Sequence, residues 1–401
     1  MTPWQRNLYL LGVGVFIAQA GFSIVVPFLP ALVEELGGGQ AVGFWSGLLL
    51  AVNFLTYSLM APVWGSLSDR VGKRPMMVRA GLGIALTYVF MAFSGQLWQL
   101  ALWRAVNGLI SGYIPAANAL VASTSPDERL GWSLGFLQGA SAAGLVSGPL
   151  IGGLAAEWAG VRGALLVAAL LLGLAGLLPL WLPPEPAVSR SEDRRLWARA
   201  AWQGVRDCLA DAYLRRLFGL QALFVAGQFL VQPTLPLYVA ERVPEDPLLA
   251  TGVVYSVVGV ATAVGSPLAS RFSDRDAGAT LRWALASSAA LAAVHAAATT
   301  LAALTLVRFV FALCTSAAAV ALGVLIARRV PATGRGATFG VLQSVTGVAS
   351  AVGPLLGGVV GDTLGLEASF WAMALTLAAG WFFCPGRPRP APALSGRGPT
   401  P

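Results

Sequence analysis

Long apolar runs alternate with short polar connections along the whole chain. Twelve such runs lie near residues 8–32, 43–65, 76–95, 98–121, 131–156, 162–182, 215–239, 249–270, 281–300, 302–326, 336–360 and 366–384. A run of about 20 apolar residues is long enough for an α-helix to cross the hydrocarbon core of a bilayer. Glycine and proline interrupt the runs often, and membrane helices tolerate both better than soluble helices do. The pattern therefore predicts an all-α polytopic membrane protein with twelve transmembrane helices.

The composition indicates a chain that is solvated mostly by lipid. Of its 401 residues, 56% are hydrophobic and 11% are charged, whereas soluble domains carry about 25% charged residues. The net charge of +8 would also suit a nucleic-acid partner. We expect no such partner, because the bases lie in short clusters between apolar runs. The three cysteines are far apart and odd in number, so they predict neither a disulfide framework nor a metal site.

The basic residues fall on one side of the predicted membrane topology. Of the 26 Lys and Arg residues, 22 lie in the even-numbered connections or in the two tails. The odd-numbered connections hold only two bases, Arg162 and Arg242, against eight acids. Because basic loops remain in the cytoplasm, the distribution predicts that both termini are cytoplasmic. It also accounts for the high net charge.

An internal repeat divides the chain into two halves. The tripeptide SDR at 68–70 recurs at 273–275, and GPLIGG at 148–153 recurs as GPLLGG at 353–358, both at an offset of 205 residues. Between them, GFLQG at 135–139 matches GVLQS at 340–344 at the same offset. Two parallel, pseudo-symmetric six-helix halves are a known plan of secondary transporters.

The repeat and the apolar runs together predict the domain boundaries. We expect an N-terminal six-helix bundle at 1–182 and a C-terminal six-helix bundle at 214–384. The segment between them, 183–213, is polar at its start and then helical in pattern, which predicts a cytoplasmic linker with an amphipathic helix. The remaining residues, 385–401, are predicted to be a disordered cytoplasmic tail.

Two dense motifs lie in these halves. The connection between the second and third runs matches a loop signature G-x-L-a-D-r-x-G-r-k through Gly65, Leu67, Asp69, Arg70, Gly72, Lys73 and Arg74. The fifth run matches g-x-x-x-G-P-x-x-G-G through Gly144, Gly148, Pro149, Gly152 and Gly153. Weaker matches are Arg104 with Asn107 and Gly108 in the fourth run, and Pro27 with Pro30 in the first. In these motifs the chain resembles transporters of the major facilitator superfamily, and more narrowly their twelve-helix drug:proton antiporter branch.

The resemblance implies roles for these motifs. It implies that Asp69 and Arg70 belong to a cytoplasmic gate that joins the two halves when the carrier faces outward. Gly65 and Gly72 would allow close backbone approach and a tight turn. Gly144, Gly148 and Gly152 form a stripe that predicts close helix packing, and the resemblance implies that this stripe closes the two halves against each other. The repeat partners of the two motifs are Asp274, Arg275, Gly353 and Pro354.

Few polar groups lie inside the predicted spans. Arg104 and its repeat partner Arg308 are the two intramembrane charges, and such residues are functional candidates by default. The nearest acids lie toward the external ends of the spans: Glu34, Glu35, Glu157, Glu241 and Asp362. Seven amides could line a largely apolar cavity or could hold helices together: Gln19, Asn53, Asn118, Gln138, Gln228, Gln232 and Gln343.

The sequence favours transport over catalysis. GWSLG at 131–135 has the spacing of a nucleophile elbow, but it opens a predicted membrane helix, and the single histidine, His295, lies in another span. We therefore predict no enzymatic activity, no cofactor and no metal. The resemblance implies a monomeric carrier of a bacterial inner membrane that exports small amphiphilic compounds in exchange for protons. A non-coupled facilitator or an uptake carrier for a small metabolite remains the alternative.

The topology gives the first prediction. Cysteines are introduced singly, Gly38→Cys in an odd-numbered connection and Ser191→Cys in the linker, into a background without native cysteines. An impermeant thiol reagent added to intact cells should label only the cysteine at position 38. Labelling at position 191 with none at 38 would reverse the topology.

Overall fold

The computed structural model describes residues 3–126, 129–182, 206, 210–329 and 335–384, and these residues form helices without strands. The N-terminal half, defined here as residues 3–182, is built in chain order from α1 (Pro3–Glu35), η1 (Gly39–Ala41), α2 (Val42–Val71), α3 (Lys73–Ala92), α4 (Leu97–Ile110), α5 (Tyr113–Thr124), α6 (Leu130–Leu177) and η3 (Leu178–Trp181). The C-terminal half, residues 212–384, holds α8 (Ala212–Leu230), α9 (Leu235–Arg242), α10 (Pro247–Ala296), α11 (Leu301–Arg329), α12 (Arg335–Leu364) and α13 (Leu366–Phe382).

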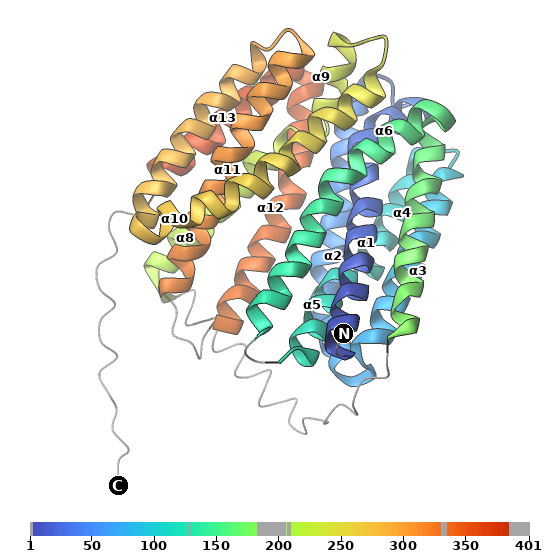
Figure 1. Cartoon of the computed structure of the whole chain (residues 1–401). Helices are drawn as coiled ribbons and strands as arrows, with labels where there is room; N and C mark the ends of the chain where they lie inside the picture. Colours follow the sequence, from blue (N-terminus) through green and yellow to red (C-terminus); the bar gives the residue numbers. More distant parts are fainter. Residues whose placement is uncertain (1–2, 127–128, 183–205, 207–209, 330–334, 385–401) are drawn as a thin grey trace.

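The described helices are consistent with the twelve predicted passages. Nine stretches of the described chain are long and apolar enough to cross a membrane, and α13 is a shorter apolar helix. Two of the nine, which contain α6 and α10, are 50 residues long, about twice what a bilayer requires. Each contains one residue with non-helical dihedral angles, Gly160 and Asp276 respectively. Figure 1 shows that the chain doubles back at both places, so each stretch crosses twice.

Two passages are broken helices. The fourth predicted run becomes α4 and α5, which are separated at Gly112, whose φ of 148° only glycine adopts readily. The seventh becomes α8 and α9, with a turn around Pro233 between them. The remaining predicted runs each form a single passage. We call the end of the bundle where α1 begins the terminal end, and the other the opposite end (Figure 1).

Each half encloses its own apolar core. In the C-terminal half the core includes the single histidine: His295 is fully buried, and its ring is stacked on Phe370 and edge-on to Phe311. Its Nδ1 lies 2.7 Å from the carbonyl oxygen of Leu291. His295 is thus a packing residue. On the outside, side chains such as Trp158 and Leu375 are largely exposed, as expected for a lipid-facing surface.

The C-terminal half begins at a capped helix. Asp211 accepts hydrogen bonds from the backbone N–H groups of Tyr213 and Leu214 at the start of α8, and it pairs with Arg329 at the end of α11 at 2.8 Å. Partial burial raises the pKa of Asp211, but these hydrogen bonds lower it by more, so it ends below its usual value. The ion pair ties two helices of this half together at the terminal end.

Glycines bring α6 and α12 against the first helix of their own half. A Cβ at Gly148 would overlap Ala20 and Ser23 of α1, and one at Gly152 would lie 2.6 Å from the ring of Phe28. In the C-terminal half, a Cβ at Gly353 would lie 2.5 Å from the carbonyl oxygen of Ala226 in α8. The glycine stripe therefore packs α6 within its own half, which differs from the expectation that it closes the two halves. Span eleven, α12, packs against α8 in the matching way through Gly353, the repeat partner of Gly148.

This packing gives the second prediction. Gly148→Val should lower the thermal stability of the purified protein by about 1–3 kcal/mol, because the added atoms meet α1 backbone that cannot move away. Gly139→Val, on the same helix, should leave stability nearly unchanged, because nothing lies within 4 Å of a Cβ there. Thermal midpoints in detergent measure both. Equal midpoints for the two variants would contradict the packing role of the stripe.

Candidate functional site

The two halves contact each other through two matching helix pairs, α2 with α12 and α6 with α10. A Cβ at Gly47 in α2 would lie 2.9 Å from the carbonyl carbon of Pro354 in α12. The matching glycine of the other pair, Gly252 in α10, would meet the carbonyl oxygen of Pro149 in α6 at 2.5 Å. Both contacts recur at the 205-residue offset of the sequence repeat. The pseudo-symmetry seen in the sequence thus extends to the interface.

The same interface continues to the opposite end of the bundle. A Cβ at Gly358 in α12 would lie 2.9 Å from the backbone nitrogen of Phe44 in α2, and one at Gly153 in α6 would lie 3.3 Å from Cα of Leu249 in α10. Asp362 crosses between the halves here and accepts hydrogen bonds from two backbone N–H groups of α2. The opposite end is therefore closed by backbone contact.

The GPxxGG motif serves both interfaces. In GPLIGG, Gly148 and Gly152 face α1 of the same half, whereas Pro149 and Gly153 contact α10 of the other half. Gly144 also faces α1, where a Cβ would lie 2.9 Å from Cβ of Gln19. The motif thus gives α6 two adjacent narrow faces, one for each neighbour.

Side-chain contacts between the two halves continue from the opposite end toward the middle of the bundle. Phe54 of α2 meets Phe229 of α8 edge-on, with ring centroids 5.2 Å apart. A Cβ at Gly259 in α10 would lie 3.1 Å from Cα of Val146 in α6. A Cβ at Gly347 in α12 would likewise lie 2.9 Å from Cβ of Ser58 in α2.

Toward the terminal end the helices stand apart. Among the described glycines with α-helical dihedral angles, which excludes Gly39 and Gly160 with their positive φ, five have nothing within 4 Å of an added Cβ. All five lie in the part of their helix that is nearer to this end: Gly65, Gly135, Gly139, Gly219 and Gly323. Two of the predicted cavity amides, Gln138 of α6 and Gln343 of α12, are exposed and are repeat partners. Exposed amides within membrane-spanning helices are expected to face water rather than lipid. They indicate an opening between the halves at the terminal end.

One predicted cavity amide is instead a packing residue. Asn53 is buried and donates from Nδ2 to the carbonyl oxygen of Arg104 at 3.1 Å and to Oδ1 of Asn107 at 2.9 Å. Asn107 in turn donates to Oγ1 of Thr87 at 2.8 Å. This network joins α2, α3 and α4, so of the two alternatives left open for Asn53 the structure has the one in which the amide holds helices together. The other four amides are half-buried: Gln19, Asn118, Gln228 and Gln232.

The two arginines of the predicted spans are both buried. Arg104 is 1% exposed, and its Nε donates to the carbonyl oxygen of Leu49 at 3.3 Å. Arg308 is 6% exposed, with its guanidinium 5.7 Å from the ring centre of Phe311. Its Nε and Nη1 have no hydrogen-bond partner among the described residues. The two arginines thus occupy equivalent positions of the repeat, but they differ in the hydrogen bonds of their guanidinium groups: Nε of Arg104 has a partner, whereas Nε of Arg308 binds no described residue.

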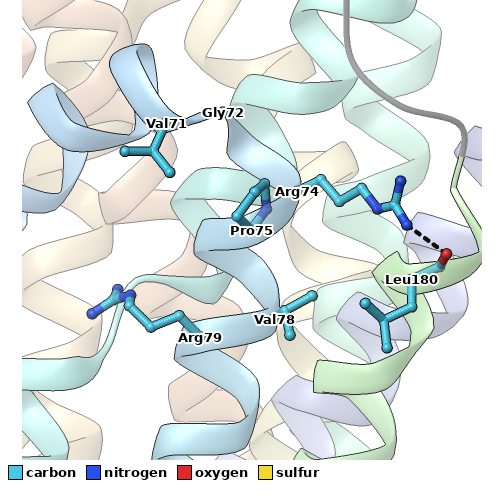
Figure 2. Close-up of a pocket in the computed structure, with 7 residues that line it drawn as sticks. All are labelled: Val71, Gly72, Arg74, Pro75, Val78, Arg79 and Leu180. Carbon is cyan, nitrogen blue, oxygen red and sulfur yellow. Dashed lines mark hydrogen bonds between the residues drawn. The ribbon is translucent and has the colours of Figure 1, made fainter.

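The loop motif lies at the terminal end, beside a cavity of about 600 Å³. Figure 2 shows Arg74 reaching from the start of α3 to η3, where its Nη2 donates to the carbonyl oxygen of Leu180 at 2.6 Å. On the other side of the cavity, Arg79 stacks over the ring of Trp64 at 3.6 Å. Both guanidinium groups therefore hold the α2–α3 turn against its own half. The sequence did not single out Arg79 or Trp64 as functional residues.

The structure separates the predicted roles of the motif residues. Gly72 lies between α2 and α3 with a φ of 102°, which confirms its place in a tight turn. Gly65 has no neighbour within 4 Å, so the predicted close approach is not made here. Leu67 packs against the core, and Lys73 is partly exposed. The side chains of Asp69 and Arg70 lie outside the described residues.

In the C-terminal half, the repeat partners Asp274 and Arg275 are exposed, and the backbone carbonyl of Asp274 accepts a hydrogen bond from Arg328 at 3.1 Å.

Comparison with known proteins agrees with this geometry. The family model described as Major Facilitator Superfamily matches residues 11–298 and 250–401. Multidrug resistance protein MdtG of Rahnella sp. (strain Y9602) is 32% identical over 398 residues, which cover 98% of this chain and 96% of that protein. MdtG of Proteus mirabilis (strain HI4320) is 31% identical, with 93% of each chain covered.

Solved structures share the fold. The nucleoside transporter NupG aligns with a TM-score of 0.80 at 12% identity, covering 94% of this chain and 97% of that one. The human organic anion transporter MFSD10 aligns with a TM-score of 0.68 at 20% identity, covering 96% and 100%. The chain belongs to the major facilitator superfamily of membrane transporters.

Proposed function

We propose that the protein exports small amphiphilic compounds across a bacterial inner membrane, in exchange for protons and by alternating access. The observation that carries this proposal is the shape of the interface between the halves. Matching helix pairs close it at one end, while the repeat partners Gln138 and Gln343 are exposed toward the other. A carrier that alternates between two faces requires such an interface. The relatives named multidrug resistance protein MdtG support export of drug-like compounds.

The charge distribution supports an orientation with both termini and the 183–213 linker in the cytoplasm. The only two bases of the odd-numbered connections are neutralised at the opposite end. Arg162 pairs with Glu35 at 3.3 Å, and Arg242 pairs with Glu367 at 3.1 Å. The excess of basic residues thus belongs to the terminal end, which the positive-inside rule assigns to the cytoplasm. In this orientation the described conformation is closed outside and open inside.

The chemistry of the opening supports amphiphilic solutes. Amides can bind polar groups without a fixed charge, and the surrounding spans are largely apolar. Export would begin when a solute enters this opening from the cytoplasm or the inner leaflet. The halves would then close at the terminal end and separate at the opposite end.

The non-coupled facilitator remains the second candidate, and one observation favours it. No Asp or Glu lies in the middle of any described span, so a membrane-embedded carboxylate that could carry the proton is missing there. Proton coupling instead rests on the family, in which proton-coupled export is common.

Flux measurements separate the two candidates and give the third prediction. Expression in a pump-deficient host should raise the tolerated concentration of several unrelated amphiphilic drugs. Inverted membrane vesicles should accumulate a fluorescent amphiphilic substrate only while a proton gradient is present. Collapse of the gradient with a protonophore should abolish accumulation. Equal flux with and without the gradient would favour the facilitator.

Arg104 gives the fourth prediction. Arg104→Ala should reduce flux per folded molecule roughly tenfold or more, because a buried charged hydrogen-bond donor is lost. Arg104→Lys should restore part of the flux, since it keeps the charge. Arg308→Ala is the matched control, and we expect a smaller change in flux because its guanidinium is less tightly held. Flux normalised to monodisperse protein is the measurement. A loss of folded protein without a change in normalised flux would make Arg104 structural only.

A further inference from the structure

Helix α2 begins without a capping group of its own. Its N-cap residue is Ala41, whose side chain accepts no hydrogen bond. The first N–H groups of a helix have no partner within the helix, and a side-chain oxygen at the N-cap normally satisfies one or two of them. In this protein the acceptor comes from the other half of the molecule.

Asp362, near the end of α12, supplies it. Its Oδ1 accepts from the N–H of Gly43 at 2.9 Å, and its Oδ2 accepts from the N–H of Phe44 at 2.6 Å. Both carboxylate oxygens are thus bound to consecutive donors in the first turn of α2. The positive end of the helix dipole lies at the same place and favours a negative charge. A residue more than 300 positions away in the sequence therefore caps the helix.

Two glycines make the approach possible. A Cβ at Gly43 would lie 2.5 Å from Oδ1 of Asp362 and 2.9 Å from the carbonyl oxygen of Gly358. A Cβ at Gly358 would lie 2.9 Å from the nitrogen of Phe44. Larger residues at either position would keep the carboxylate from the helix end.

The repeat shows that the other helix pair is built differently. The residue that corresponds to Ala41 is Asp246, at the same 205-residue offset. Asp246 is the N-cap of α10 and accepts from the N–H of Leu249 at 3.3 Å. The residue that corresponds to Asp362 is Glu157, which is exposed and makes no hydrogen bond or ion pair with any described residue. One helix therefore carries its own cap, whereas its symmetry mate borrows one across the interface.

We propose that Asp362 is a latch of the opposite end, which caps α2 only while the two halves are closed there. Asp246 can cap α10 in every conformation, because donor and acceptor belong to the same helix. The cap of α2 is lost as soon as α12 moves away from it. Asp362 therefore stabilises the conformation that is closed at this end and contributes nothing to the alternative one. It is a positioning residue of the transport cycle, and the inference rests on the alternating access proposed above.

The test measures the separation of the halves directly. Spin labels are attached to cysteines introduced by Gln96→Cys and Thr299→Cys, which replace exposed loop residues of the two halves at the opposite end, in a background without native cysteines. In the otherwise unchanged protein the short distance should dominate. Asp362→Ala should raise the ratio of the long-distance to the short-distance population on the order of 3- to 30-fold, the effect of losing a helix cap. In Asp362→Asn the ratio should lie between that of the unchanged protein and that of Asp362→Ala, because one amide oxygen replaces two carboxylate oxygens.

Two further variants distinguish a latch from a local structural role. Glu157→Ala removes the symmetry-related acid, which binds no described residue, and should leave the populations unchanged. Ala41→Asp combined with Asp362→Ala gives α2 a cap of its own in both conformations, so the ratio should stay as in Asp362→Ala. A return of the double variant to the original distribution would show that Asp362 only prevents fraying of α2, and the latch would be wrong.

An unchanged distribution in Asp362→Ala would overturn the proposal outright. The distances require no transported solute, so this outcome is independent of the flux experiments. If flux assays fail while the populations shift as expected, the proposed substrates are wrong and the latch stands.

Discussion

Close contact between helix backbones is the constraint on which this structure depends. In a bilayer, apolar side chains gain little by leaving lipid for one another, so helices associate through close van der Waals packing at small residues. The structure meets this requirement at both levels of its organisation. Gly148 and Gly152 bring α6 onto α1 within one half, and Pro149 and Gly153 bring the same helix onto α10 of the other. A helix with one small face could join only one neighbour. The adjacent glycines of GPxxGG let α6 hold its own half while it releases and regains the other.

The sequence was sufficient for those features that are repeated or periodic. The twelve apolar runs, the repeat at 205 residues and the burial of both arginines follow from composition and spacing, and the structure has all of them. Spacing shows that Gly144, Gly148 and Gly152 share a face, but not which helix that face meets. The amide of Asn53 looks the same in sequence whether it lines a cavity or binds Asn107. The capping of α2 depends on a helix more than 300 residues away, although the replacement of Asp246 by Ala41 in the repeat was a visible sign of it.

The two halves are alike in backbone and different in polar detail. Around Arg104, a network of Asn53, Asn107 and Thr87 joins three helices. The corresponding positions in the C-terminal half are Val258, Phe311 and Ala292, whose side chains cannot form such a network, and two N–H donors of Arg308 bind no described residue. Burial of unpaired donors costs free energy. The hydrogen-bond network thus holds the helices around Arg104 together more firmly than the helices around Arg308 are held. The sequence repeat gives both halves the same backbone arrangement, and substitutions at single positions give the two halves different roles.

The glycines without neighbours show how the same helices are used in the other conformation. A glycine inside a helix destabilises it by about 0.5–1 kcal/mol relative to alanine, so a glycine that contacts nothing is a cost without a visible gain. The five described glycines that have α-helical dihedral angles and contact nothing all lie toward the terminal end, among them Gly135 and Gly139 of α6. On the closed side, every glycine of this helix from Gly144 to Gly153 meets another helix within 4 Å. If the halves rock about their middle, the contacts that open at one end must be replaced by contacts at the other. Gly135 and Gly139 then provide the narrow surface that such a closure needs, and their present lack of neighbours follows from the conformation that Asp362 holds at the far end.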